Sequence, residues 1–238
     1  MAIEILPLTK ADIPEAVECI QKAFADDPYF HWVFNDPSGF NIHRNAASLT
    51  AHFLYGLSCN EPIYIAKSTA PKDASDKYPP AGPSVVGVCW WFSPQPPSKS
   101  VPWSVWAQDW LLSFRQLFFN IKFGGRGGLN VRRYWMWKDR QQKTHDKVWT
   151  DPRGYYFCNV IAVDSSMRGM GVGRKLVEIV SQKADAEGMP CYLESSKGFP
   201  NLAIYEKLGF ELVSEIDCVD GGDACKLYCM IRQPKIKA

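Results

Sequence analysis

The chain has 238 residues, 46% of them hydrophobic, and a formal net charge of +2 at pH 7. This length suits one large domain or two small ones, and the composition allows a sizeable core. The near-neutral charge argues against a protein dominated by electrostatic binding to nucleic acids or membranes. No apolar run has signal-peptide character, and none approaches the roughly 18 residues of a membrane span. We therefore expect a cytoplasmic protein, with the nucleus as the other possible compartment.

The cysteine pattern favours buried free thiols. None of the eight cysteines forms a C-x-x-C pair, and most lie in apolar runs. Disulfides and zinc sites are therefore not expected, and no metal is predicted. No cysteine lies on a recognisable nucleophile elbow. The histidines His31 and His145 lie in aromatic or charged surroundings and are interpreted as structural.

The first 92 residues are predicted to contain strands and helices in alternation. Apolar residues such as Ile13, Val17 and Ile20 recur at helical spacing, and Asp26-Asp27-Pro28 is interpreted as a helix stop. The expected elements are a strand at 2–8, helices at 10–25 and 41–58, and strands at 62–67 and 85–92. The segment joining the last two strands is rich in Pro, Ser and charge, which predicts a long mobile hairpin loop.

Residues 93–150 form a block with six of the nine tryptophans. Apolar residues from Trp103 to Ile121 make a helical stripe, the glycines of 124–128 interrupt it, and a second helix is expected to about residue 145. One interpretation is a helical subdomain whose aromatic residues pack on the main core. Another is a wall that shapes an apolar substrate pocket, and the two are compatible.

The same block carries most of its charge as Lys and Arg. We interpret these residues as the solvated face of an amphipathic helix, with a site for an anionic ligand or for nucleic acid as alternatives. The basic residues are Lys122, Arg126, Arg132, Arg133, Lys138, Arg140, Lys143 and Lys147.

The C-terminal part begins with an apolar strand at 156–163, a glycine-rich bend and a long amphipathic helix that ends at Gly188. A short strand at 191–196 and a short helix at 201–210 follow. Two final strands, at 211–219 and 226–231, are joined by a turn at 220–223. The order of the elements predicts an α/β fold with a mixed sheet that is antiparallel at its beginning and end.

The bend reads Arg168-Gly-Met-Gly-Val-Gly173. Glycines at the start of a helix let backbone N–H groups approach a ligand at the positive end of the helix dipole, an arrangement that holds phosphates. A P-loop is excluded because Arg174 is followed by Lys and Leu, with no hydroxyl for magnesium. A dinucleotide fingerprint fits poorly because the glycines are spaced G-x-G-x-G and no acid-tipped strand follows.

The spacing R-x-x-G-x-G after the strand Val160–Val163 resembles the acetyl-CoA motif of the GNAT superfamily of acyl-CoA-dependent N-acyltransferases. Two further features strengthen the resemblance: the strand CYLESS at 191–196, and the helix end YEKLGF at 205–210. The resemblance implies one GNAT domain over 1–238. Its mixed, mostly antiparallel central sheet is expected to be flanked by helices, with 93–150 as a helical insertion between strands three and four.

The resemblance also implies how acetyl-CoA is bound as a co-substrate. The strands 156–163 and 191–196 are expected to part at a bulge, so that the pantetheine arm pairs with the backbone of Ile161 and Val163. Backbone N–H groups from Arg168 to Gly173 are expected to hold the pyrophosphate. The full set of expected cofactor-binding residues is Ile161, Ala162, Val163, Arg168, Gly169, Met170, Gly171, Val172, Gly173, Arg174 and Asn201.

Tyr205 is the candidate general acid, because an ordinary Tyr has a pKa near 10 and keeps a proton for the departing thiolate at pH 7. Removing the proton of the attacking amine needs a base. Glu194, at the end of a strand, is the first candidate, and Asp26 and Asp27 are the second.

These features predict an N-acetyltransferase that transfers acetyl from acetyl-CoA directly to a primary amine of a small molecule, without a metal. Two alternatives stay open: a non-catalytic acyl-CoA binding or sensing module, and an acetyltransferase for protein lysines or N-termini. No nucleic-acid or membrane partner is expected, and monomer and homodimer are both possible.

Overall fold

The computed structural model describes residues 3–68, 83–96, 100 and 102–235. The strands are β1 (Ile3–Pro7), β2 (Ile63–Ser68), β3 (Ser84–Phe92), β4 (Tyr156–Val163), β5 (Cys191–Ser195), β6 (Glu211–Asp220) and β7 (Asp223–Arg232). The α-helices are α1 (Ile13–Ala23), α2 (Pro28–Val33), α3 (Ile42–Ser58), α4 (Trp103–Lys122), α5 (Val131–Val148), α6 (Val172–Glu187) and α7 (Asn201–Lys207). Short 3₁₀ turns cover Lys10–Asp12 and Ser165–Met167.

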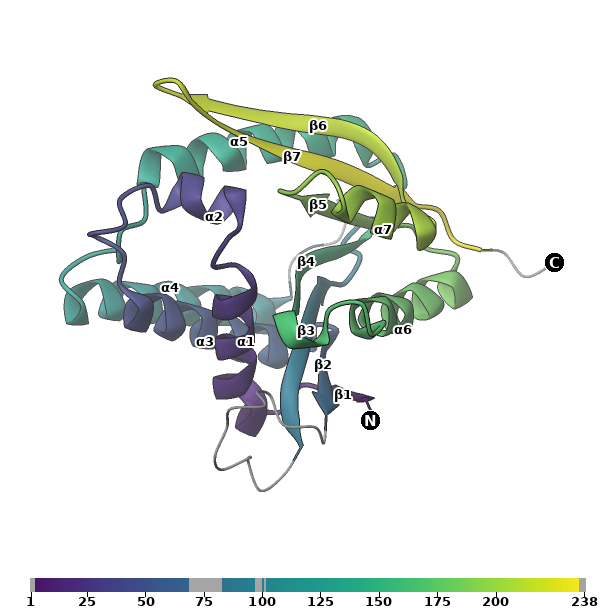
Figure 1. Cartoon of the computed structure of the whole chain (residues 1–238), viewed down its shortest axis with the longest axis horizontal. Helices are drawn as coiled ribbons and strands as arrows, with labels where there is room; N and C mark the ends of the chain where they lie inside the picture. The colour runs from purple at the N-terminus through teal and green to yellow at the C-terminus, as the bar shows by residue number, and fades with distance from the viewer. Residues whose placement is uncertain (1–2, 69–82, 97–99, 101, 236–238) are drawn as a thin grey trace.

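The seven strands form one sheet in the order β1-β2-β3-β4-β5-β7-β6 (Figure 1). Five of its strand pairs are antiparallel, and the β4–β5 pair is parallel. A parallel pair needs a crossover connection, and α6 supplies it between β4 and β5. The predicted mixed, mostly antiparallel sheet is confirmed. The predicted mobile loop between β2 and β3 lies almost wholly outside the described residues.

Helices cover both faces of the sheet (Figure 1). One buried cluster joins α6 to β3, β4 and β5. A second joins α1 and α3 to β2 and β3 on the opposite face, and a third joins α2 and α5 to β5, β6 and β7 on that same opposite face. In the described part of the chain, no helix has both the length and the apolar character needed to cross a bilayer.

Helix α2 is the element that the sequence analysis missed. Asp27 and Pro28 were interpreted as a helix stop, yet they also begin a helix. The Asp27 Oδ1 accepts a hydrogen bond of 2.9 Å from the Phe30 N–H, and Pro28 occupies the first turn, where its missing N–H costs nothing. Helix α1 has already ended at Ala23, with Phe24 as its C-cap, and Asp27 and Pro28 begin α2.

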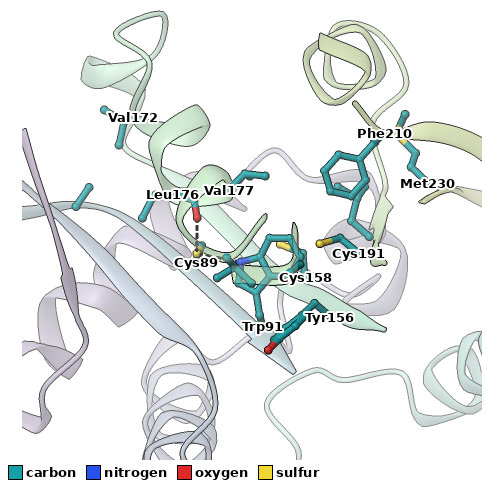
Figure 2. Packing of buried hydrophobic residues seen from close by; sticks show 14 of the residues in the cluster. Cys89, Trp91, Tyr156, Cys158, Val172, Leu176, Val177, Cys191, Phe210 and Met230 are labelled. Atoms are coloured by element: carbon teal, nitrogen blue, oxygen red, sulfur yellow. Dashed lines mark hydrogen bonds between the residues drawn. The ribbon is translucent and has the colours of Figure 1, made fainter. Parts of the chain in front are cut away.

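The cluster beneath α6 contains several of the cysteines (Figure 2). The Cys89 thiol donates to the Leu176 carbonyl at 3.2 Å, and the Trp91 Nε1–H donates to the Cys89 sulfur at 3.2 Å. Burial raises the pKa of Cys89 to about 12, which keeps the thiol protonated and unreactive. All eight cysteines are free and only Cys59 is not buried, so the predicted buried thiols are confirmed.

The two helices of 93–150 behave differently. In α5, Tyr134, Met136 and Trp137 pack against the third cluster, as predicted. In α4, by contrast, none of the twenty residues is buried, and the helix packs on α3 rather than on the sheet. The expectation that the aromatic residues of this block pack on the main core is therefore wrong for α4. Gln116 and Asn120 of α4 accept hydrogen bonds from Arg44 of α3 at 2.9 and 2.8 Å.

One basic residue of the block does not lie on a solvated face. The Arg133 side chain is 7% exposed and donates to Asp220 at 3.1 Å, to Asp223 at 2.7 Å and to the Trp32 carbonyl at 3.0 Å. These contacts join α5 to α2 and to the β6–β7 turn. The expectation of a solvated residue is wrong here because the two carboxylates of the hairpin turn compensate the buried charge.

We predict that Arg133→Met lowers the free energy of unfolding by about 3 kcal/mol, because a buried ion pair loses one partner. The neighbouring Arg132 provides a matched control, since it pairs with the same Asp220 at 3.3 Å but its side chain is 79% exposed. Arg132→Met should cost at most about 1 kcal/mol. Urea unfolding of both variants measures the difference, and equal losses would contradict the structural role of Arg133.

Candidate active site

The parallel pair β4–β5 is joined over only a short length. Its partners are Tyr156 with Cys191, Phe157 with Tyr192, and Cys158 with Leu193. Beyond Cys158 the two strands pair no further, although β4 continues to Val163 and β5 to Ser195. The parting of these strands that the resemblance implied is confirmed.

A β-bulge lies where the strands part. Trp91 is paired with Cys158 and Trp90 with Val160, so Asn159 is an extra residue in β4. Such a bulge bends the strand that contains it and changes which way the following side chains point. Cys158 packs in the cluster beneath α6, but the next side chain toward α6 is that of Ile161 instead of Val160.

The bulge also decides which backbone groups of β4 are free. The Asp164 N–H donates to the Val86 carbonyl of β3 at 2.9 Å. Alternate residues of a strand direct their backbone groups to opposite edges, so Ala162 faces β3, and Ile161 and Val163 face the open edge toward β5. Ala162 lines the cavity described next, but its backbone groups are directed away from that cavity.

A cavity of about 770 Å³ occupies the space between the parted strands. It is lined by the end of α1, the free half of β4, the glycine-rich loop, the start of α6, the end of β5, and α7. Every residue expected from the sequence to bind the cofactor or to act in catalysis lines it, except Met170. Among the described residues, the lining includes none from α4 or α5.

The glycine-rich loop presents bare backbone at one end of this cavity. Gly169 and Gly171 have φ values of 78° and 76°, a region that favours glycine, and a Cβ atom on either would meet nothing within 4 Å. Gly171 is the N-cap of α6, with no side chain capping the helix. Its N–H and those of Val172 to Arg174 lack intrahelical partners and form a positively polarised anion site.

Two N–H groups of the loop are used internally. The N–H of Arg168 donates to the Ser165 carbonyl at 3.3 Å, and that of Met170 donates to the Met167 carbonyl at 3.4 Å. Met170 is also exposed, outside the cavity. The Arg174 side chain pairs with Glu178 at 2.6 Å on the helix surface. The backbone N–H groups of 171–174 are therefore better suited to bind an anion than those of Arg168 and Met170.

Tyr205 lies on the α6 side of the sheet. Its ring packs edge-on against Phe210, with the ring centres 6.1 Å apart, and contacts the cluster beneath α6. Burial, together with the nearby Cys158 and Asp27, raises the pKa of Tyr205 well above its ordinary value, so the hydroxyl stays protonated at neutral pH. Asn201, one turn earlier in α7, lies with its Nδ2 3.5 Å from the Ser195 hydroxyl.

Glu194 points to the opposite face of the sheet. Side chains alternate along β5, so Glu194 shares its face with Tyr192 of the third cluster, while Leu193 faces α6. The Glu194 carboxylate accepts hydrogen bonds from Tyr192 at 2.9 Å and Gln141 at 2.8 Å. The His145 Nε2 lies 3.0 Å from the same carboxylate.

The contact between α5 and Glu194 had no signal in the sequence. Gln141 and His145 are about fifty residues away along the chain, and only the packing of α5 on the sheet brings them to β5. The His145 ring stacks on Trp149 with the ring centres 4.1 Å apart, which holds the imidazole against Glu194. His145 was interpreted as structural, and the structure places it directly beside the first candidate base.

The second candidate bases already have other partners. Asp27 is 6% exposed, caps α2, and accepts a hydrogen bond from the Ser196 hydroxyl. Asp26 pairs with Lys197 at 2.9 Å, and this hydrogen bond lowers the pKa of Asp26. Both contacts join the α1–α2 turn to the chain leaving β5, and all four residues line the cavity.

Comparisons with known proteins agree with this arrangement. A family model described as an acetyltransferase (GNAT) domain matches residues 132–212. An uncharacterized N-acetyltransferase of Schizosaccharomyces pombe is 25% identical over 96% of this chain and 92% of its own.

Solved structures share the fold. A histone acetyltransferase HPA2 and related acetyltransferase from Corynebacterium glutamicum aligns with a TM-score of 0.59 and 21% identity, covering 100% of this chain and 99% of its own. A polyamine N-acetyltransferase of Drosophila melanogaster aligns with a TM-score of 0.60 and 12% identity, covering 98% and 100%. The family model over 132–212 and the full-length relative, together with the parted strands and the glycine-rich loop, support membership of the GNAT superfamily, and the solved structures show that the chain has the fold of these acetyltransferases.

Proposed function

We propose that this protein transfers the acetyl group of acetyl-CoA directly to the primary amine of a small molecule. The observation that carries the proposal is the cavity between β4 and β5, which passes from one face of the sheet to the other. Tyr205 lines it on the α6 side, and Glu194 lines it on the side of α2 and α5. A donor thioester and an acceptor amine can therefore meet between a proton donor and a proton acceptor.

The described residues fit acetyl-CoA as a co-substrate. The unpaired N–H groups of 171–174 would hold the pyrophosphate, and the bare glycines let the phosphates approach. The exposed side chain of Arg168 can add a charged contact. The backbone groups of Ile161 and Val163 would pair with the pantetheine arm, taking the place of the hydrogen bonds that β5 does not make.

The proposed reaction needs no covalent enzyme intermediate. The amine nitrogen forms a bond to the thioester carbonyl carbon, and the bond from that carbon to sulfur breaks. Glu194 accepts the proton that the amine loses, and Tyr205 gives a proton to the departing CoA thiolate. A backbone N–H of Ile161 or Val163 would stabilise the oxyanion that develops on the carbonyl oxygen.

Two observations favour a small acceptor over a protein chain. The contacts of Asp26 with Lys197 and of Asp27 with Ser196 join residues that line the cavity from two segments, and we expect them to limit access for an extended peptide. Apolar residues of the lining, including Phe24 and Leu193, suit an amine with an apolar part. One structural neighbour is a polyamine N-acetyltransferase, and another is related to a histone acetyltransferase, so the experiment includes both acceptor classes.

The experiment is an assay of free CoA thiol with purified protein, acetyl-CoA and a panel of polyamines, arylalkylamines and lysine-containing peptides. Turnover with one or more small amines and not with peptides is the expected result. Turnover with peptides alone would overturn the assigned substrate class. Binding of acetyl-CoA with no CoA release on any acceptor would instead favour a non-catalytic binding module.

We predict that Gly171→Ala lowers the affinity for acetyl-CoA at least tenfold. Alanine is strained in the left-handed backbone conformation of Gly171, and its Cβ would lie where the pyrophosphate would bind. Gly188→Ala is the matched control. Gly188 caps the other end of the same helix with φ 63° and also has open space around its Cβ. Gly188→Ala should lower the free energy of unfolding by a similar amount and leave the affinity for acetyl-CoA unchanged. Calorimetric titration with acetyl-CoA measures the affinity of each variant. Equal affinities of Gly171→Ala and Gly188→Ala would show that the loop is not part of the binding site.

We predict that Tyr205→Phe lowers kcat by about 10² or more while the affinity for acetyl-CoA is retained, since only the proton donor is lost. Tyr156→Phe is the control, because Tyr156 belongs to the same buried cluster and its hydroxyl donates to Glu187 at 2.6 Å, away from the cavity. Wild-type turnover in Tyr205→Phe would exclude the acid role.

We predict that Glu194→Gln lowers kcat at neutral pH by about 10² or more, because the amide cannot accept the amine proton. The defect should shrink as the pH rises toward the pKa of the acceptor amine, where solvent has already removed that proton. A pH profile of kcat/KM for wild type and variant checks this. A defect of constant size at every pH would mean that Glu194 acts only through its contacts with Gln141 and His145.

A further inference from the structure

The outer face of α4 carries a continuous apolar stripe. Its residues are all between 40% and 74% exposed, in a helix that contributes nothing to the main core. We call this set the α4 stripe; its members are Trp103, Trp106, Trp110, Leu111, Phe114, Leu117, Phe118 and Ile121. The stripe is remote from the proposed reaction, since none of its residues lines the cavity.

Helix α4 is amphipathic, but its polar side faces the protein and its apolar side faces outward. A helix on a monomer normally turns its apolar side toward the protein. Here polar side chains face the protein: Gln116 accepts hydrogen bonds from Arg44 and Ser48 of α3, and the Asp109 carboxylate contacts the Tyr55 hydroxyl. The apolar side faces outward. Helix α4 packs alongside α3, and in Figure 1 it extends to the left margin of the molecule.

The stripe is too large to be an ordinary feature of a monomer. With roughly 150–250 Å² per aromatic side chain, its eight members expose on the order of 1,000 Å². The largest apolar patch of a typical monomer is about 300–600 Å². A standard protein interface buries about 800 Å² on each partner, which the α4 stripe alone can supply.

The spacing of the stripe fits a second helix. Five residues of the stripe and Ala107 form a seam with separations of four, three, four, three and four residues, the 3.5-residue repeat of a coiled coil. The seam residues are Trp103, Ala107, Trp110, Phe114, Leu117 and Ile121. The charged residues of α4, Asp109, Arg115 and Lys122, lie off this seam. An uncharged seam can face a copy of itself across a two-fold axis without like-charge repulsion.

The sizes of the seam residues favour an antiparallel arrangement. A two-fold axis at the middle of the seam would place Trp103 against Ile121 of the second copy and Ala107 against Leu117, so that a larger residue meets a smaller one in these outer pairs. The central pair would be Trp110 against Phe114, an aromatic contact. A parallel arrangement would stack Trp103 and Trp110 each on its own copy. It would also place equal ends of two helix dipoles side by side.

We propose that the α4 stripe is the interface of a homodimer in which two copies of α4 pack antiparallel. The dimer covers the exposed aromatic residues of the stripe, none of which lines the cavity. It does not depend on the chemistry assigned to Tyr205 or Glu194.

Sedimentation velocity at about 10–100 μM tests the oligomeric state, and the wild type is expected at twice the mass of one chain. Phe114→Glu should shift it to a monomer, with the dissociation constant raised at least a hundredfold. Trp135→Glu is the matched control, because Trp135 is also an aromatic residue, 62% exposed, on α5 and off the stripe, and this variant should stay dimeric. Circular dichroism confirms that both variants are folded.

A cross-linking experiment tests the arrangement. In a Cys59→Ser background, Ala107→Cys mixed with Leu117→Cys should give a disulfide-linked dimer on mild oxidation, and neither variant alone should do so. A monomeric wild type, a dimer that Phe114→Glu leaves intact, or cross-linking of each variant only to itself would overturn the proposal. A monomer that binds phosphatidylcholine–phosphatidylserine vesicles through the α4 stripe, measured by flotation, would also overturn the proposal.

Discussion

The extra residue Asn159 in β4 is the constraint on which the cavity depends. Up to Cys158, β4 pairs with β3 on one side and with β5 on the other. The bulge bends β4 and reverses the direction of the backbone groups that follow, so Ile161 and Val163 offer free hydrogen-bonding groups at an edge that no strand covers. Buried backbone groups need partners. An extended ligand such as pantetheine would meet that need, which connects a local irregularity of one strand to a binding site.

The opening passes through the sheet, and the two sides differ in chemistry. The α6 side combines the positive end of a helix dipole with a tyrosine that burial keeps protonated. The opposite side places a carboxylate beneath α5, where Gln141 and His145 orient it. This division follows from the alternation of side chains in β5, because Leu193 and Glu194 must point to opposite faces.

The insertion between β3 and β4 has two helices with different tasks. Helix α5 packs on the sheet, where Arg133 contacts the β6–β7 turn and Gln141 donates a hydrogen bond to Glu194. Helix α4 is held to α3 by Arg44, Gln116 and Asn120 and turns its aromatic residues outward. An aromatic-rich helix in a sequence therefore does not by itself indicate a core, since the position of the polar contacts decides which face is left for solvent or a partner.

Much of the fold was predictable from local patterns in the sequence. The strands and most helices followed from hydrophobic periodicity, and the glycines of 169–173 indicated the anion site because φ values near +77° at the start of a helix are accessible to few other residues. The short α2 was missed because Asp27 and Pro28 suit both the end of one helix and the beginning of the next. The wrong environments assigned to Arg133 and to the aromatic residues of α4 have a common cause, because periodicity defines a face of a helix but not what covers it.

The residues around the candidate base were decided by the tertiary structure alone. Glu194 was selected for its place at the end of a strand, but its contacts with Gln141 and His145, and those of Asp27 with Ser196, join segments about 50 to 170 residues apart. The sequence by itself determined the strands, the helices and the loop that can bind a phosphate, because these depend on the propensities and φ values of neighbouring residues. The free edge of β4, the partners of each carboxylate and the outward face of α4 depend on packing between distant segments, and only the folded chain brings those segments together.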